Sequence, residues 1–193
     1  MSEAYVACVN FNLDEIKKTV NQTNINNIFE KNGITPLMTV IMDTKLETTD
    51  DHRKRYECVV YLVENCKADI SITNKQEFNA FHFAAVALVE DVFDDKVIDK
   101  WPNMRTTIIN YPVEIIRTMV KSIPIDIRYD ILMKRGEGGN FPLRLVKNER
   151  VRIELNKSIQ VVLRWKKQKW IERNPKQAAL RKKLGLEIPS LKF

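Results

Sequence analysis

The sequence predicts an all-α fold built from repeated pairs of helices, and three observations lead to this prediction. A glycine-containing turn runs directly into an apolar helical pattern at Gly33–Met38. The same kind of start returns, in altered form, at Glu77–Ala85 and at Gly139–Leu143. Pro112–Ile123 places its apolar residues three and four positions apart, which is the spacing of one helix face. A unit that recurs along a chain is typical of a solenoid, in which each unit packs on its neighbours.

The first of these starts has a clear physical basis. Gly33 supplies a turn position of positive φ, which a residue with a Cβ atom resists. Thr35 is a candidate helix N-cap, and Pro36 then takes the first helical position, where its missing N–H costs nothing. The following apolar residues keep helical spacing and predict one buried face: Leu37, Val40 and Ile41.

These motifs resemble the ankyrin repeat, whose consensus opens Gly-x-Thr-Pro-Leu-His and continues with small residues. His82-x-Ala84-Ala85 matches the consensus His-x-Ala-Ala, with Asn79 in place of the threonine cap. Thr35 and Asn79 are 44 residues apart, and Asn79 and Phe141 are 62 apart. Because an ankyrin period is about 33 residues, the resemblance implies insertions of roughly 11 and 29 residues.

The resemblance implies an ankyrin-like solenoid of about three irregular repeats, with a cap at each end. The expected units lie near residues 5–30, 31–72, 73–132 and 133–165, and the insertions at 44–55 and 90–110. Ala4–Val9 and Leu13–Val20 are expected to form the first, capping hairpin. The expected second helices of the later units are Tyr56–Asn65, Pro112–Ile123 and Ile153–Trp165, the last preceded by a short helix over Pro142–Val146. On this interpretation residues 1–150 are the repeat domain.

Charge is distributed unevenly along the chain. The formal net charge is +7. Residues 1–143 carry 17 Lys and Arg against 21 Asp and Glu, whereas residues 144–193 carry 15 against 4. A basic final quarter indicates a segment that meets something acidic. No run of about 20 apolar residues occurs, so the sequence predicts neither a membrane span nor a membrane partner.

Residues 151–193 are expected to form a capping helix and a basic C-terminal arm. Val151–Ile171 is predicted to be helical, with a second short helix over Gln177–Leu186. The residues expected on the buried side of the first helix are Ile153, Ile159, Val162, Leu163 and Trp165. Basic residues interleaved with tryptophan suit a phosphate backbone or an acidic protein groove, and a cap whose charges face solvent fits the same pattern. The candidate partner-binding residues are Arg164, Trp165, Lys166, Lys167, Lys169, Trp170, Arg173, Arg181, Lys182 and Lys183.

Residue types that carry catalysis or bind metals are sparse. The chain has two histidines, and His82 is expected to hydrogen-bond within its own repeat. The acidic run Glu90–Asp95 lacks the glycine and final glutamate of a calcium loop, so a solvated loop is expected. Arg135–Asn140 lacks the Lys and Ser/Thr of a phosphate loop and is expected to be the turn between two repeats. Three cysteines without metal-ligand spacing are expected to be buried, reduced thiols: Cys8, Cys58 and Cys66.

These patterns favour a non-enzymatic intracellular protein, cytoplasmic or nuclear, with no cofactor and no bound metal. Its expected function is to bind another protein through the concave face of the ankyrin-like stack, as an adaptor or inhibitor. The alternative is a structural component of a large ribonucleoprotein or viral assembly, whose basic arm contacts nucleic acid or an acidic neighbour. The Asn-, Ile- and Lys-rich composition resembles that of ankyrin proteins of large DNA viruses, which implies a viral protein.

Overall fold

The computed structural model describes residues 2–29, 33–42, 48–94 and 109–188. This part of the chain is mostly helical, which confirms the predicted all-α class. The helices are α1 (Glu3–Val9), α2 (Leu13–Thr19), α3 (Pro36–Met42), α4 (Thr49–Val60) with a π-helical extension η1 (Tyr61–Asn65), α5 (Ala80–Ala87), α6 (Tyr111–Ser122), α7 (Ile125–Leu132), the 3-10 turn η2 (Glu137–Gly139), α8 (Pro142–Leu145), α9 (Glu149–Arg173) and α10 (Pro175–Lys183). Two short antiparallel strands pair, β1 (Phe93–Asp94) with β2 (Ile109–Asn110).

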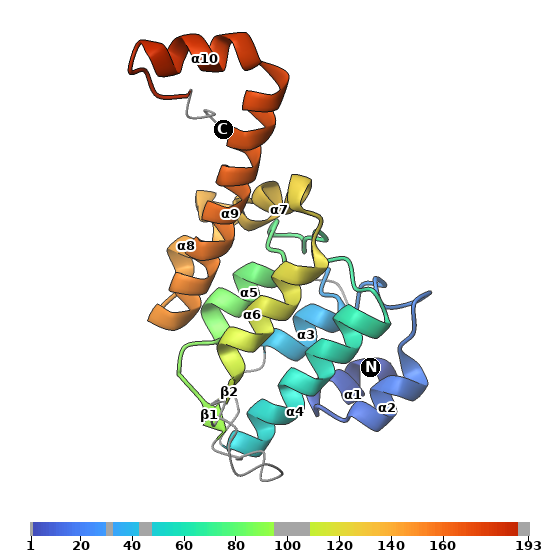
Figure 1. Ribbon diagram of the computed structural model, residues 1–193. Helices are drawn as coiled ribbons and strands as arrows, with labels where there is room; N and C mark the ends of the chain where they lie inside the picture. The colour runs from blue at the N-terminus through green and yellow to red at the C-terminus, as the bar shows by residue number, and fades with distance from the viewer. Residues whose placement is uncertain (1, 30–32, 43–47, 95–108, 189–193) are drawn as a thin grey trace, which may run out of the picture.

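The helices are arranged in two layers that run along the molecule (Figure 1). In the layer that we call the inner layer, α1 packs on α3, α3 on α5 and α5 on α8. In the second layer α2 packs on α4, α4 on α6 and α6 on α9. Successive helices therefore alternate between layers, and each pair meets mainly the pair before it and the pair after it. The additional helix α7 lies between α6 and α8 in sequence and packs on α9.

Three inner-layer helices begin with the same local geometry. Three positions before the first residue of each helix stands a residue of positive φ: Gly33 (φ 78°) before α3, Glu77 (φ 60°) before α5 and Gly139 (φ 73°) before α8. Each turn is closed by a backbone hydrogen bond, from Phe29 N to Ile34 O, Asn74 N to Phe78 O, and Gly136 N to Asn140 O. The starts expected at Gly33–Leu37 and Asn79–Ala85 are therefore confirmed as helix starts. Turn chemistry is local, which is why sequence spacing could locate it.

Neighbouring turns also pack against each other. The Glu137 amide donates to the Gln76 carbonyl at 2.8 Å, which links the second turn to the third. A Cβ atom on Gly136 would lie 2.0 Å from the Phe78 ring, so only glycine fits beneath that ring. A Cβ atom on Gly33 would lie 3.2 Å from the Asn74 Cα. The glycines therefore serve close approach between units as well as turn geometry.

A continuous apolar core lies between the two layers. Leu37, Val40 and Ile41 of α3 are buried, as the sequence predicts, and so are Phe81, Ala84 and Ala85 of α5. Alanine at these positions lets helices approach closely, and larger side chains from α6 fill the remaining space: Ile115, Ile116 and Met119. Burial of this apolar surface is the main source of stability for such a stack.

The polar stretch expected as an insertion at 44–55 is partly helical, which corrects that prediction. Residues 44–47 lie outside the described residues, but α4 already begins at Thr49. Thr48 and Asp51 form a reciprocal capping box at its start. Asp50 then pairs with Arg53 and Lys54 along the helix surface. The sequence lacked an apolar period here because capping and ion pairs, rather than an apolar face, support the first turns.

Two other expectations fail in the second half of the chain. α7 was not predicted, because the segment IDIRYDIL alternates polar and apolar residues and does not show a helical period. Ile153 was expected on the buried side of α9, but it is 43% exposed. Ile159 and Val162 are buried as predicted, together with Val151, Leu155 and Ser158, whereas Leu163 and Trp165 are only half-buried. Packing on α6, α7 and α8 decides which face of this helix is covered.

The acidic run contains a structural residue. Asp91 accepts hydrogen bonds from Asn110 Nδ2 at 2.8 Å and Asn148 Nδ2 at 3.2 Å, and it pairs with Arg150 at 2.9 Å. Asn110 and Asn148 are the N-caps of α6 and α9. Burial raises the pKa of Asp91, but the two amide donors and the Arg150 charge outweigh it and hold this pKa below its usual value. Asp91 thus ties the starts of two second-layer helices together, while residues 95–108 of the expected insertion lie outside the described residues.

Candidate partner-binding site

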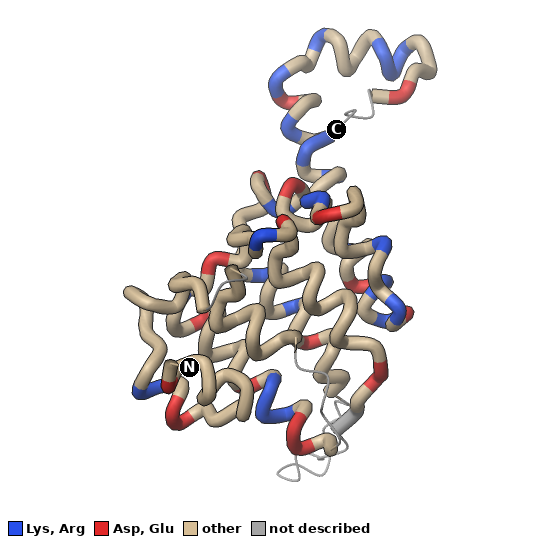
Figure 2. The backbone as a smooth tube through the Cα atoms, turned by 180° about the vertical axis from the view of Figure 1, so that it is seen from behind, with Lys and Arg blue, Asp and Glu red and all other residues tan. Residues whose placement is uncertain are grey.

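The C-terminal arm, residues 164–188, extends away from the two helical layers (Figure 1). It consists of the last turns of α9, all of α10 and the segment that follows α10. The arm carries nine Lys and Arg and two Glu, and Figure 2 shows Lys and Arg along its length. A net charge of +7 on so short a projection produces a strong positive potential that attracts acidic partners.

α9 changes role along its length. Its first half is a cap, because Val151, Leu155 and Val162 are buried against the body. Trp165 and Trp170 are only half-buried, so the second half is not simply a cap. Lys166 marks the transition: its Nζ lies 4.7 Å from the centre of the Tyr129 ring and 3.9 Å from Asp130 Oδ1, both on α7. This cation–π contact and ion pair hold α9 to the body just before the helix projects.

A sharp elbow joins α9 to α10. Asn174 ends α9 by donating from its backbone and side-chain nitrogens to the Trp170 carbonyl, each at 2.9 Å. Pro175 then occupies the first position of α10, where its ring favours a helix start. The expected second helix is therefore present, although it starts two residues earlier and ends before Leu186.

The chain turns back after α10 in a Schellman motif. Gly185 has φ 64°, its amide donates to the Lys182 carbonyl at 3.3 Å, and the Leu186 amide donates to the Arg181 carbonyl at 2.9 Å. Arg181 Nη1 also donates to the Glu187 carbonyl at 2.8 Å. These bonds fold the segment after Gly185 back toward the end of α9 and give the arm a defined shape.

A groove of about 470 Å³ lies inside this elbow. Its volume falls in the range of about 300–1,000 Å³ that is typical of ligand pockets. Lys167 and Lys182 are the two cationic residues that line it. The apolar residues that line it come from both helices and the returning segment: Ile171, Pro175, Ala178, Ala179, Leu186 and Ile188. Glu187 is the one acidic residue of this lining, so an apolar surface is combined with two cations and one carboxylate.

The eight basic residues among the ten predicted partner-binding residues fall into three groups, and the other two are the half-buried Trp165 and Trp170. Lys166 contacts Asp130 of α7, and its side chain is only 16% exposed. It therefore positions the arm and is poorly placed to contact a partner. Lys169 is paired with Glu172 at 2.9 Å, and Arg181 holds the Glu187 carbonyl. The remaining basic residues of the set are exposed: Arg164, Lys167, Arg173, Lys182 and Lys183.

Sequence reasoning missed the apolar part of the arm. Leu180, Leu184 and Leu186 are 57%, 59% and 53% exposed, outside any core. The four-residue spacing of Leu180 and Leu184 was visible, but it reads equally well as the buried face of a helix. Only the position of α10 relative to the body distinguishes a buried face from an exposed one.

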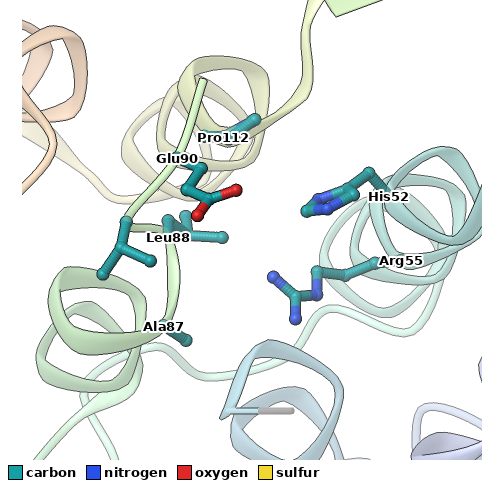
Figure 3. Close-up of a pocket in the computed structure, with 7 residues that line it drawn as sticks. His52, Arg55, Ala87, Leu88, Glu90 and Pro112 are labelled. Atoms are coloured by element: carbon teal, nitrogen blue, oxygen red, sulfur yellow. The ribbon is translucent and has the colours of Figure 1, made fainter. Parts of the chain in front are cut away.

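A second, smaller pocket of about 120 Å³ lies among α4, the segment after α5 and the start of α6. His52 and Arg55 extend into it from α4, opposite Glu90 and Pro112 (Figure 3). Burial, followed by the Arg55 charge, lowers the pKa of His52. Arg55 is fully buried and also lies over the Phe11 ring at 5.7 Å. This volume is well below that of a typical ligand pocket, so we assign the cluster to packing between units.

His82 has the structural role that the sequence predicts. The Asn79 amide donates to His82 Nδ1 at 3.1 Å, and His82 Nε2 lies 3.3 Å from the Asn140 carbonyl in the next turn. The Phe78 ring stacks on the imidazole, with 5.0 Å between ring centres. Burial lowers the pKa of His82, which favours the neutral ring that these two hydrogen bonds require.

The three cysteines are buried thiols, as expected. Burial, with a smaller effect from the neighbouring Cys58 thiol, raises the pKa of Cys8 to about 12, and burial likewise raises the pKa of Cys58 to about 12. At neutral pH these thiols are protonated, and a thiol is a far weaker nucleophile than a thiolate. Their position therefore suits packing rather than covalent chemistry.

In residues 2–29, 33–42, 48–94 and 109–188, no three His, Cys, Asp or Glu side chains are grouped so that they could hold a metal ion. Over the same ranges, no helix combines the length and apolar character that crossing a membrane requires. No protein-family model matches the chain, and no curated protein matches it significantly.

Proposed function

We propose that this chain is a non-catalytic protein-interaction module, an adaptor or inhibitor, built as an irregular ankyrin-like stack. Two features support the ankyrin-like assignment: helices alternate between two layers, and inner-layer helices start from the same positive-φ turn. Stacks of this kind present an extended surface, along which neighbouring units place equivalent residues side by side. A partner would bind across several units at once.

The observation that carries this proposal is an apolar row on the exposed side of the inner layer. Positions are counted from the residue that precedes each helix. The seventh position is Met42 on α3, which is 39% exposed, and Val86 on α5, which is 55% exposed. The fourth position is Val6 on α1 and the half-buried Phe83 on α5. Because α1, α3 and α5 pack side by side, we infer that these four side chains lie near one another on one side of the inner layer, and we call them the inner-layer row. Exposed apolar residues that are contiguous over several elements mark interaction surfaces.

A matched pair of substitutions tests the proposal. Val86→Glu places a charge in the inner-layer row, whereas Val161→Glu places the same charge on α9 at a residue that is 46% exposed. Both sites are solvent-accessible, so we expect each substitution to change stability by no more than about 0.5 kcal/mol. Tagged full-length chains would be used to capture proteins from lysate, with quantitative mass spectrometry of what is retained.

We expect a specific protein to be retained by the wild type and by Val161→Glu, and depleted about tenfold or more by Val86→Glu, which corresponds to about 1.4 kcal/mol. Equal retention by both variants would show that the inner-layer row is not the binding surface. Unfolding by circular dichroism must be the same for both variants, which confirms that loss of binding is not loss of fold.

The second candidate function, a component of a ribonucleoprotein or viral assembly, is favoured by the projection and charge of the arm. Full-length protein would be titrated with single-stranded RNA and duplex DNA at several salt concentrations. A phosphate-binding arm predicts that log affinity falls with log salt by about 0.7 to 0.9 per phosphate contacted. Binding that survives high salt and nuclease treatment would favour the protein-interaction function instead.

A further inference from the structure

We propose that the groove in the arm binds an acidic peptide segment with an apolar face, contributed by a partner protein. This surface is separate from the inner-layer row, so the inference does not depend on the proposed function of that row. Three properties of the elbow support this occupant: its shape, its apolar lining and the sign of the surrounding charge.

The shape of the elbow is built in before any partner binds. Asn174 and Pro175 set the angle between α9 and α10, and the Schellman motif at Gly185 returns the chain toward Ile171. Arg181 fixes the returning segment through the Glu187 carbonyl. A site that is already ordered loses less conformational entropy on binding than one that must fold around its ligand.

The lining of the groove favours apolar side chains. Ile171 lies on α9, Ala178 and Ala179 on α10, and Leu186 and Ile188 on the returning segment. The two small alanines leave room for a partner side chain to enter between the helices. Burying apolar surface here contributes about 25 cal/mol for each Å² removed from water. Leu180 of α10 and Leu184, which follows the helix, do not line the groove and are exposed elsewhere on the arm.

Charge selects an acidic partner. Lys167 and Lys182 line the groove with one acidic residue, Glu187, and further exposed basic residues of the arm include Arg173 and Lys183. Residues 164–188 carry a net +7, so a neutral or basic peptide would gain nothing from this field and an acidic one would be attracted to it. An acidic segment with apolar residues on one face complements both properties at once.

The lining argues against nucleic acid as the occupant. Single-stranded nucleic acid is bound by aromatic rings that stack on bases, together with cations that follow the phosphates. Neither Trp165 nor Trp170 lines the groove, and its apolar residues cannot hydrogen-bond to phosphate. A bilayer would meet the exposed Leu180 and Leu184 of the arm rather than the recessed residues of the groove, so anionic vesicles serve as a competing ligand in the test.

Fluorescence anisotropy with a labelled synthetic peptide tests the inference on the full-length protein. The probe is an amphipathic Glu/Leu/Ala peptide of about 14 residues, or four helical turns, with leucines on one face. A scrambled peptide of the same composition keeps the charge and removes the apolar face. Single-stranded DNA of similar charge and anionic phospholipid vesicles are the competing ligands.

The central variant is Ala179→Glu, which places a carboxylate in the groove, and its matched control is Gln177→Glu. Gln177 is exposed on the same helix and does not line the groove, so both changes make the arm one charge more negative. We expect Ala179→Glu to lower the affinity for the amphipathic peptide about tenfold or more. Gln177→Glu should lower this affinity less than about twofold, because only Ala179→Glu blocks the groove. Lys182→Gln, which removes one cation from the rim, should have an intermediate effect.

Three results would overturn the inference. Equal binding of the scrambled peptide would mean that charge, without the apolar groove, accounts for the affinity. Equal losses for Ala179→Glu and Gln177→Glu would mean the same. Tighter binding of DNA or vesicles, unaffected by Ala179→Glu, would identify a phosphate-bearing partner for the arm. The inner-layer test with Val86→Glu is independent, so either proposal can fail without the other.

Discussion

The half of α9 that covers the body and the helix that follows it, α10, place leucine in opposite environments. Leu155 is 1% exposed in the half of α9 that covers the body, whereas Leu180 on α10 is 57% exposed. Both leucines lie in helices, and both recur with other apolar residues at helical spacing. The difference is set by what lies opposite: α6, α7 and α8 cover the first half of α9, and the arm projects beyond them. Helical apolar spacing therefore predicts a face, and tertiary structure decides whether that face stabilises the fold or meets a partner.

The largest expected effect compares these two leucines directly. Leu155→Ala should lower the free energy of unfolding by about 2–5 kcal/mol, because it removes buried methyl groups and leaves a cavity. Leu180→Ala should change it by less than about 0.5 kcal/mol, since that side chain is mostly in solvent. Urea unfolding followed by circular dichroism measures both. Similar losses for the two variants would mean that the arm packs on the body.

The packing between neighbouring turns gives the next largest effect. Gly136→Ala places a Cβ atom 2.0 Å from the Phe78 ring, which must move and disturb its stacking on His82. We expect a loss of about 1–3 kcal/mol, as for other overpacked sites. Gly185→Ala in the arm is the control: no heavy atom of the described residues lies within 4 Å of the added Cβ, and the strain of a positive φ remains. The two variants should differ in the midpoint of thermal unfolding. An equal change in midpoint would mean that the packing of Gly136 against Phe78 adds nothing to the strain of a substituted glycine.

The link between α6 and α9 should make a smaller contribution. Asp91→Ala removes the acceptor shared by Asn110 and Asn148 and the ion pair with Arg150. Because the Asp91 side chain is 34% exposed and partly screened by water, we expect a loss of about 1 kcal/mol. The pKa of Asp91 is lowered in the folded state, so this contribution is present above the unfolded pKa near 3.8 and is lost as pH falls through the folded one. The wild type and Asp91→Ala should therefore converge in stability under acid, and a constant difference would exclude the charged form of Asp91.

The smallest effect concerns His82 and mild acid. Its pKa is lowered below the usual value of 6.5, so the unfolded chain binds the proton more readily. Stability should be full above about pH 6.5 and should fall as pH drops through this value toward the folded pKa. We would compare the change in urea midpoint between about pH 7.5 and about pH 5.5 for the wild type and His82→Gln. His52 is present in both chains, so a smaller pH response in His82→Gln isolates His82, and an identical response would contradict its neutral buried state.

The structure also changes how the arm should be studied. A chain that ends at Arg150 would remove Val151, Leu155 and Val162 along with the arm, and these residues are part of the core. Loss of binding by such a truncation would not distinguish a missing arm from an unfolded body. Substitutions at exposed positions of α10, such as Ala179 and Gln177, leave the core intact and separate the two explanations.

The sequence alone was enough to predict the all-α class and the starts of α3 and α5. Thr35 and Asn79 could be identified because an N-cap acts on amides within three residues, and Gly33 because a positive φ is a property of one residue. It also located the uneven charge and the structural role of His82, both of which follow from short-range patterns. The ankyrin-like assignment remains a proposal that rests on these local features and on the layered packing.

Tertiary structure alone decided three matters that depend on residues far apart in the chain. It placed Leu155 rather than Ile153 in the core, because helices from earlier units cover only one side of α9. It brought Asp91, from the acidic run expected to be a solvated loop, within hydrogen-bonding distance of the N-cap residues of two helices. It also left Leu180 of α10 and the following Leu184 exposed, outside the core. Burial is a property of the assembled neighbours of a residue, so local sequence predicts which faces are apolar but not which of them are covered.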